Sequence, residues 1–288
     1  MKRYKFIAKL NHGFDISIFK VRPDKKIPTL SVNERPFQKQ LLGKKASYTG
    51  TIISGDNSLT VYDQTVLLTI TSLVSEMSEM ETLDWTDGVT NDELDKMLRI
   101  NGEYLSNISF KINTNSLIKS CRPNTKINNV SSAERKRFIE ALYRLNSIDY
   151  KLESKDFPLK SALLAYLIKG RNISISLHPS ISEAIKSQKS YMQIDLNHRA
   201  LLSEPAKALY TYLACSTYSS NKQTSYLFST LIEKVYQYSD SKRRFKTRLD
   251  KVVDCLKEIS ALNILDLEYD SQGTKVTVKR IEKKLIIE

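Results

Sequence analysis

The stretch SDSKRRFKTRLDKVVDCLKEI, residues 239–259, begins with a basic cluster and continues as an apolar ladder at helical spacing. At about 100° per residue, Phe245, Leu249, Val252 and Leu256 fall on one stripe, which predicts a helix packed along that side. The basic residues of its first half are Lys242, Arg243, Arg244, Lys246, Arg248 and Lys251. Like charges at this spacing repel by a few tenths of a kcal/mol per pair. We therefore expect a polyanion to lie across this half.

The residues around this stretch predict a small unit of helices and strands. In order they are a strand at 191–196, helices at 204–217, 225–237 and 239–260, and a strand pair at 264–270 and 274–280. Three helices followed by a hairpin indicate a winged helix.

The first half of the chain repeats this order. Ser131 and Glu134 have the spacing of a capping box, which predicts a helix at 131–146 with Phe138, Leu142 and Leu145 buried. A helix at 59–75, with Ser58 or Thr60 as its cap, and a short helix at 114–121 precede it. Predicted strands are 47–53, 147–154, 161–170 and 171–179, and a short helix is predicted at 180–187. Corresponding helices of the two halves also share similar residues in the same order, which favours duplication of one structural unit.

The fold class predicted is α+β, mostly helical, with two tandem winged-helix domains and a basic N-terminal arm. We expect the arm at 1–45, the first domain at 46–188 and the second at 189–288. The arm has twelve basic and three acidic residues, whereas 76–95 has eight acidic residues and no basic one. Segment 76–95 is a solvated helix with Trp85 packed inward, a docking face for a basic protein partner, or a decoy for the protein's own basic surface.

The composition also limits the function. The net charge of +13 favours nucleic acid or an anionic membrane as partner. The uncharged apolar-leaning run at 64–75 is too short to span a bilayer. Three scattered cysteines, three isolated histidines and the lack of a phosphate-loop motif give no catalytic, metal or cofactor site. We expect a cytoplasmic, non-enzymatic protein without cofactor or membrane association.

Three stretches carry a family resemblance: SKRRFKTRLDKVVDCL at 241–256, YMQIDLNHRALLSEPAKALYTYL at 191–213 and ISISLHPSISEAI at 173–185. Together with the basic arm and the order of elements, they resemble the iteron-binding replication initiators of plasmids, most closely the IncQ-type replication protein C. The resemblance runs from about Phe14 to Arg280. It implies binding to direct repeats of double-stranded DNA at a plasmid origin, origin opening, and recruitment of a replicative helicase.

An exposed mixture of Arg, Thr and acid suits the edges of base pairs in a major groove. Predicted DNA-binding residues are Ser132, Lys136, Arg137, Glu140 and Arg144 on the first helix, Ser239, Ser241, Lys242, Arg243, Arg244, Lys246, Thr247, Arg248 and Lys251 on the second, and Lys275 and Lys279 on the last hairpin. Two alternatives stay open: a winged-helix transcriptional repressor that binds an inverted repeat, and a structural adaptor. The oligomeric state, monomer or dimer, is also open.

Overall fold

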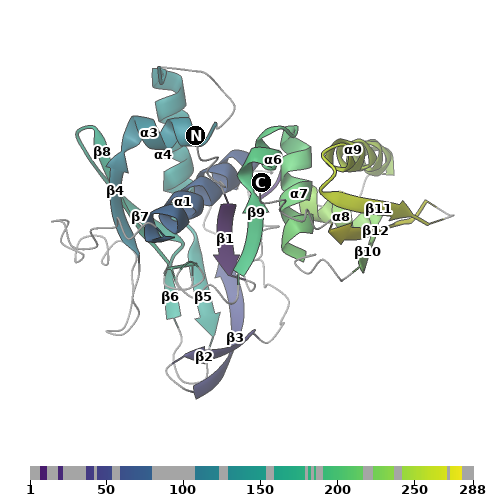
Figure 1. Ribbon diagram of the computed structural model, residues 1–288, viewed down its shortest axis with the longest axis horizontal. Helices are drawn as coiled ribbons and strands as arrows, with labels where there is room; N and C mark the ends of the chain where they lie inside the picture. The colour runs from purple at the N-terminus through teal and green to yellow at the C-terminus, as the bar shows by residue number, and fades with distance from the viewer. Residues whose placement is uncertain are drawn as a thin grey trace, which may run out of the picture.

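The computed structural model describes residues 7–11, 19–21, 37–41, 44–53, 59–79, 108–122, 129–153, 159–178, 181–182, 185, 191–216, 223–236, 242–270 and 273–280. These residues form helices and small antiparallel sheets, which confirms the α+β class (Figure 1). Within them, no helix combines the length and the apolar character that crossing a bilayer requires.

The C-terminal unit contains the stretch that begins with the basic cluster. Its elements are α7 (Glu204–Ser216), β10 (Gln223–Leu227), α8 (Phe228–Val235), α9 (Lys242–Ser260), β11 (Leu265–Tyr269) and β12 (Lys275–Arg280), and the sheet order is β10-β12-β11. The helix predicted at 225–237 is wrong in its first part, where the chain is extended. Tyr226 lies opposite Val276 in the sheet and is buried there, so strand pairing takes these residues out of the helix.

The N-terminal unit has the same order of elements. It consists of α1 (Val61–Glu79), β4 (Ser109–Asn113), α3 (Thr114–Ser120), α4 (Ser132–Asn146), β7 (Leu164–Lys169) and β8 (Asn172–Leu177), with sheet order β4-β8-β7. In each unit the strand before the second helix pairs with the last strand of the hairpin. Between α4 and β7 the chain adds β5 (Asp149–Glu153) and β6 (Leu159–Ala162), which join β2 (Phe37–Leu41) and β3 (Lys44–Ile53) in a second sheet.

Local caps explain where the first unit's helices begin. The Asp63 amide donates to Thr60 Oγ1 at 3.3 Å and the Thr60 amide donates to Asp63 Oδ2 at 2.8 Å, which confirms Thr60 as a cap. The Glu134 amide donates to Ser131 Oγ at 3.2 Å, and Glu134 Oε2 accepts from the Ser131 amide at 2.8 Å. The predicted capping box is therefore confirmed.

A two-stranded ribbon joins the two units. Strand β1 (Ile7–Asn11) pairs with β9 (Tyr191–Asp195), and this ribbon packs on α1 through β1 and on α7 through β9. Figure 1 shows the ribbon between these two helices. The buried apolar residues form one cluster that runs through both units.

Part of the predicted basic arm therefore packs against the folded units. Phe19 is buried, the Lys20 amide donates to the Leu59 carbonyl, and the Val21 amide donates to the Val235 carbonyl, each at 3.0 Å. Whether 1–45 is a separate region, and where the domains divide, stays a prediction.

Three predicted segments can be compared with the structure over all or part of their length. The run at 161–170 is extended, as predicted, and belongs to β6 and β7. Helix α1 continues beyond the predicted end at Ser75 to Glu79, and the rest of the acidic segment lies outside the described residues. Of the short helix predicted at 180–187, only 181–182 and 185 are described, in helical conformation.

Candidate nucleic-acid interface

The N-terminal half of α9 extends beyond the hydrophobic core. From Val252 onward, one side of the helix is buried against α7, α8 and β11, whereas residues 243–247 are all exposed. Phe245, predicted to be buried, is 41% exposed, while Leu249 is only partly buried. The prediction for Phe245 is wrong because the first turns of α9 project past the described elements that bury its second half.

The basic side chains of this half surround a groove of about 560 Å³. Arg243, Arg244, Lys246, Thr247 and Lys251 are exposed, and all but Lys246 line the groove. The rest of its lining is Val21, Glu204, Pro205, Tyr236 and Arg248. The groove is thus strongly cationic, with one acid at its rim.

Two of the predicted residues in α9 have partners of their own. The Arg248 guanidinium carbon lies 5.5 Å from the centre of the Tyr236 ring, in a cation–π contact. The Thr247 hydroxyl donates to the Arg243 carbonyl at 3.2 Å, one turn earlier. Ser239 and Ser241 lie outside the described residues, as does the side chain of Lys242.

The hairpin beside α9 is held in shape by Asp270. Its carboxylate accepts from the Thr274 amide at 2.7 Å, the Thr274 hydroxyl at 2.7 Å and the Lys275 amide at 2.9 Å. These hydrogen bonds, above all the one from the Thr274 hydroxyl, lower the pKa of Asp270. Gly273 has φ +62°, a conformation that glycine adopts without strain. Lys275 and Lys279 are both exposed, as a phosphate contact would require.

Helix α4 presents a weaker version of the same surface. Ser132, Lys136 and Glu140 are exposed and line a shallow groove of about 510 Å³ with Arg135. The Arg135 guanidinium, however, donates to Asn115 Oδ1 at 2.7 Å. Phe138, Leu142 and Leu145 are buried, as the periodicity predicted, and Ala141 is buried with them.

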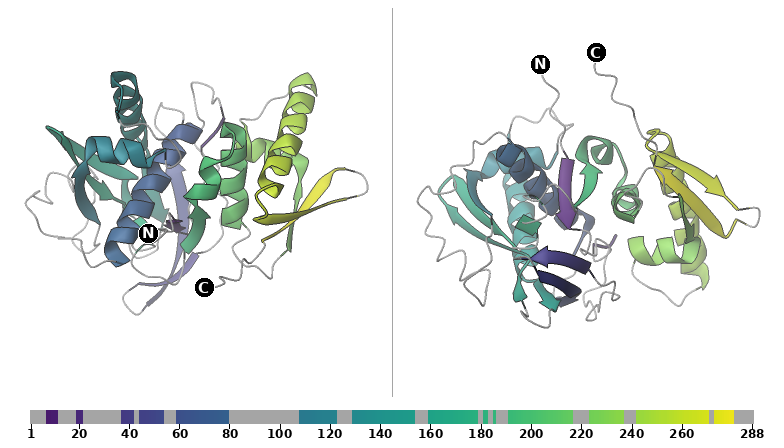
Figure 2. Two further views of the ribbon diagram at one scale, coloured as in Figure 1. Left: turned by 45° about the horizontal axis from the view of Figure 1, so that its top comes forward. Right: turned by 60° about the horizontal axis from the view of Figure 1, so that its bottom comes forward.

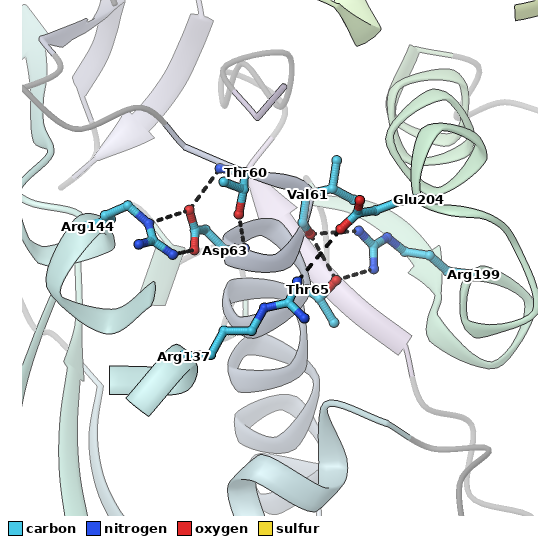
Figure 3. Close-up of polar contacts among 8 residues, drawn as sticks. All are labelled: Thr60, Val61, Asp63, Thr65, Arg137, Arg144, Arg199 and Glu204. Atoms are coloured by element: carbon cyan, nitrogen blue, oxygen red, sulfur yellow. Dashed lines mark hydrogen bonds and ion pairs between the residues drawn. The ribbon is translucent and has the colours of Figure 1, made fainter. Parts of the chain in front are cut away.

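The remaining two arginines predicted on α4 contact neighbouring helices (Figure 3). Arg144 was expected on the exposed flank, which is wrong: it donates to both oxygens of the fully buried Asp63, at 2.9 and 2.8 Å. This hydrogen bonding raises the pKa of Arg144. Arg137 lies 4.0 Å from the centre of the Tyr62 ring and 3.8 Å from Glu204 Oε1. Its side chain remains about half exposed.

Sequence reasoning missed one arginine altogether. Arg199, on the short helix α6 (Leu196–Ala200), is buried between the two units and donates to Thr211, Thr65, Gln64 and the Val61 carbonyl. Burial lowers the pKa of its guanidinium to about 9, which leaves it charged at pH 7. A single Arg in a polar turn has no local pattern that would have marked it.

The cysteines and histidines form no second site in the described part of the chain. All three cysteines are free, and Cys121 and Cys255 are buried, as small core residues are. Burial raises the pKa of each of these two thiols to about 12. His178 is fully buried, and desolvation lowers its pKa to about 3. Among the described residues, no group of His, Cys, Asp and Glu has the arrangement of a metal site.

The exposed cations of α9 and of the last hairpin give this α+β chain a surface suited to contact a polyanion. Residues 114–280 match the family Replication protein C (RepC), and the chain belongs to this family. Family membership gives it a role in DNA replication, as a replication initiator of the plasmid type.

Two crystal structures of domains 2 and 3 of RctB are similar to this chain. The selenomethionine derivative aligns with 91% of this chain and 95% of its own, at 14% identity and a TM-score of 0.46. The other aligns with 92% and 96%, at 13% identity and a TM-score of 0.39. No curated protein matches the chain.

Proposed function

We propose that this protein initiates plasmid replication by binding directly repeated double-stranded DNA at the origin, opening it and recruiting a replicative helicase. The observation that carries this proposal is the first half of α9, where Arg243, Arg244 and Lys251 are exposed and line a groove. Membership of the RepC family supports the replication part of the proposal.

Each unit is proposed to be a winged helix. Both have the order helix, strand, helix, helix, hairpin, and in both the first strand pairs with the last. In such a unit the third helix, α4 or α9, enters a major groove while the hairpin reaches the flanking phosphates. Lys275 and Lys279 on β12 are suited to the second task.

We further propose that α9 is the stronger reader of the two helices. On α9, Arg243, Arg244 and Lys246 are exposed and lie in the first turns, where the helix dipole also favours an anion. On α4, Arg137 and Arg144 already contact neighbouring helices. Compared with α4, α9 therefore offers more positive charge to DNA without first breaking a contact inside the protein.

The number of exposed cations predicts how strongly the affinity for DNA should depend on salt concentration. Arg243, Arg244, Lys246, Lys251, Lys275 and Lys279 are exposed on α9 and the hairpin. If each met one phosphate, the slope of log K against log salt would be about −5. A polyanion would also relieve the repulsion among the α9 cations.

A binding assay with flanking DNA tests the proposal. Duplexes from the DNA beside the gene, carrying one repeat, two direct repeats or an inverted repeat, are titrated with protein by fluorescence anisotropy. We expect binding to the single repeat and tighter binding to the tandem copies. Preference for the inverted repeat would favour a repressor, and equal binding to unrelated DNA would contradict both.

Matched variants on α9 locate the contact. Arg243→Ala should relax discrimination at one base position by about 1–3 kcal/mol, and Lys251→Ala should reduce the salt slope by roughly one unit. Lys257→Ala is the control: the same charge is lost from the same helix, but Lys257 lies in its last turn beside Asp254, at 3.5 Å. If all three variants bind alike, α9 is not the reader.

Two further assays address the later steps. Origin opening should make thymines of the adjacent AT-rich block reactive to permanganate when protein is added. Helicase recruitment should appear as loading of the plasmid's or host's helicase on that opened DNA only when the protein is present. We also propose that the protein acts without cleaving DNA, so supercoiled plasmid should remain unnicked after incubation.

A further inference from the structure

A buried arginine connects the two units directly. Arg199 Nη1 donates to Thr65 Oγ1 at 2.8 Å and Arg199 Nη2 donates to Gln64 Oε1 at 2.7 Å, both on α1 of the N-terminal unit. Arg199 Nε donates to Thr211 Oγ1 at 3.0 Å, on α7 of the C-terminal unit. One planar guanidinium thus holds the first helix of each unit. Figure 3 shows its hydrogen bond to Thr65 on α1.

The chemistry of this contact makes it sensitive to any relative movement of the units. Arg199 is 2% exposed, and the acceptors named above are neutral. A guanidinium taken out of reach of these oxygens would remain buried with its donors unsatisfied, which is costly. Rotation of one unit on the other is therefore opposed, beyond the opposition from apolar packing.

A second contact holds the same two units from the other side. Lys20 Nζ donates to the Glu233 and Lys234 carbonyls at the end of α8, at 2.6 and 3.2 Å. The Lys20 amide donates to the Leu59 carbonyl just before α1. The strap of residues 19–21 therefore bridges the start of α1 and the end of α8.

The contacts of Arg199 and of the strap, here called the joint, determine how the two candidate DNA-reading helices, α4 and α9, are placed relative to each other. Figure 2 (left) shows α4 and α9 at opposite ends of the molecule, both projecting toward the top of the view. B-DNA presents its major groove to the same side once per turn, about every 10 base pairs. Two helices held in fixed positions can meet two such sites only at a fixed separation.

We propose that Arg199 is a positioning residue that sets the spacing and helical phase of the two DNA contacts. This inference rests on the proposed function, because it requires α4 and α9 to meet the same duplex. Arg199 itself does not touch DNA in this proposal and acts only through the orientation of the units.

Selection of bound duplexes from a random library tests the proposal. The full-length protein should select two sequence blocks at one separation. Arg199→Ala should select the same blocks at several separations, because each reading surface is unchanged while the joint is loosened. A variant that is merely less stable would lose bound DNA without changing the distribution of separations.

Affinities measured on the selected sites give the magnitude. Inserting 5 base pairs between the two sequence blocks rotates one block about the DNA axis by half a turn relative to the other. The wild-type protein should then be unable to bind both blocks at once, and its affinity should fall roughly 100-fold. For Arg199→Ala the same insertion should cost about tenfold or less. Arg199→Lys, which keeps the charge without the fork, should fall between the two.

Further variants keep the test decisive if Arg199→Ala does not fold. Thr65→Val removes one acceptor on α1, and Lys20→Met removes the two Nζ hydrogen bonds to α8 but keeps the bond from the Val21 amide to the Val235 carbonyl. Each variant should broaden the accepted separations. A wild-type protein that accepts several separations, or variants that keep the single separation, would overturn the inference. Selection of no sequence at all, or of one block only, would instead contradict the proposed two-site binding.

Discussion

Replacing Asp63 by alanine should destabilise the N-terminal unit strongly. The Asp63 carboxylate is fully buried, accepts two hydrogen bonds from Arg144 and caps α1 through the Thr60 amide. Losing a cap costs about 1 kcal/mol. Removing one partner of a buried ion pair costs about 3–5 kcal/mol.

The lower end of that range applies because the Arg144 side chain is 22% exposed and can turn toward water. The sum is about 4 kcal/mol, which is a large part of the 5–15 kcal/mol typical of a folded domain. At about 2–3 °C per kcal/mol for a chain of this size, the unfolding midpoint should fall by about 10 °C.

Thermal and urea unfolding followed by circular dichroism measure the effect. Asp63→Asn, which keeps an oxygen for the Thr60 amide, should lose about 1 kcal/mol less than Asp63→Ala. Asp254→Ala removes an acid that is 74% exposed and should cost less than about 1 kcal/mol. The loss in Asp63→Ala should be the same at pH 7 and pH 9, because the hydrogen bonds to Asp63 raise the pKa of Arg144 and the pair is intact at both. A loss no larger than that of Asp254→Ala would refute the reasoning.

Three other perturbations have expected outcomes that unfolding and labelling experiments check. Phe138→Ala should cost about 3–5 kcal/mol because its ring is fully buried, whereas Phe245→Ala should cost below about 1 kcal/mol; equal costs would contradict the exposure of α9. Ser131→Ala should lower stability by about 1 kcal/mol by removing the cap of α4, and an unchanged urea midpoint would show that the cap is unimportant. Burial raises the pKa of Cys121 to about 12, so its contribution to stability is complete below pH 9 and falls as pH rises from 9 toward 12; rapid alkylation of the native thiol at pH 8 would contradict its burial.

The boundaries of most helices and strands were predictable because their signals are local. Ser131 and Glu134 lie three residues apart and mark the start of α4 without reference to the rest of the chain. The apolar spacing of Phe138, Leu142 and Leu145 likewise indicates the buried face of that helix. Where a strand precedes a helix without a turn, as at Tyr226, local pattern failed because pairing with β12 decided the conformation.

The candidate interface was predicted in part. Arg243, Arg244, Lys246 and Lys251 of the basic cluster are exposed. The same periodicity predicted that Phe138 is buried, which is correct, and that Phe245 is buried, which is wrong. Periodicity says which residues share a side of a helix, whereas burial requires a neighbouring element to lie against that side. Among the described residues of α9, apolar burial on that side begins at about Leu249.

The sequence by itself determined the α+β class, the repeated order of elements and the concentration of positive charge at the start of α9, because composition, caps and periodicity act over a few residues. Only the tertiary structure decided which arginines stay exposed. Arg144 meets Asp63 from 81 positions away, and Arg199 meets Thr65 from 134 positions away. A hydrogen bond depends on distance in space. Arg144 and Asp63 come within 3 Å only when the N-terminal unit folds, and Arg199 and Thr65 only when the two units pack together.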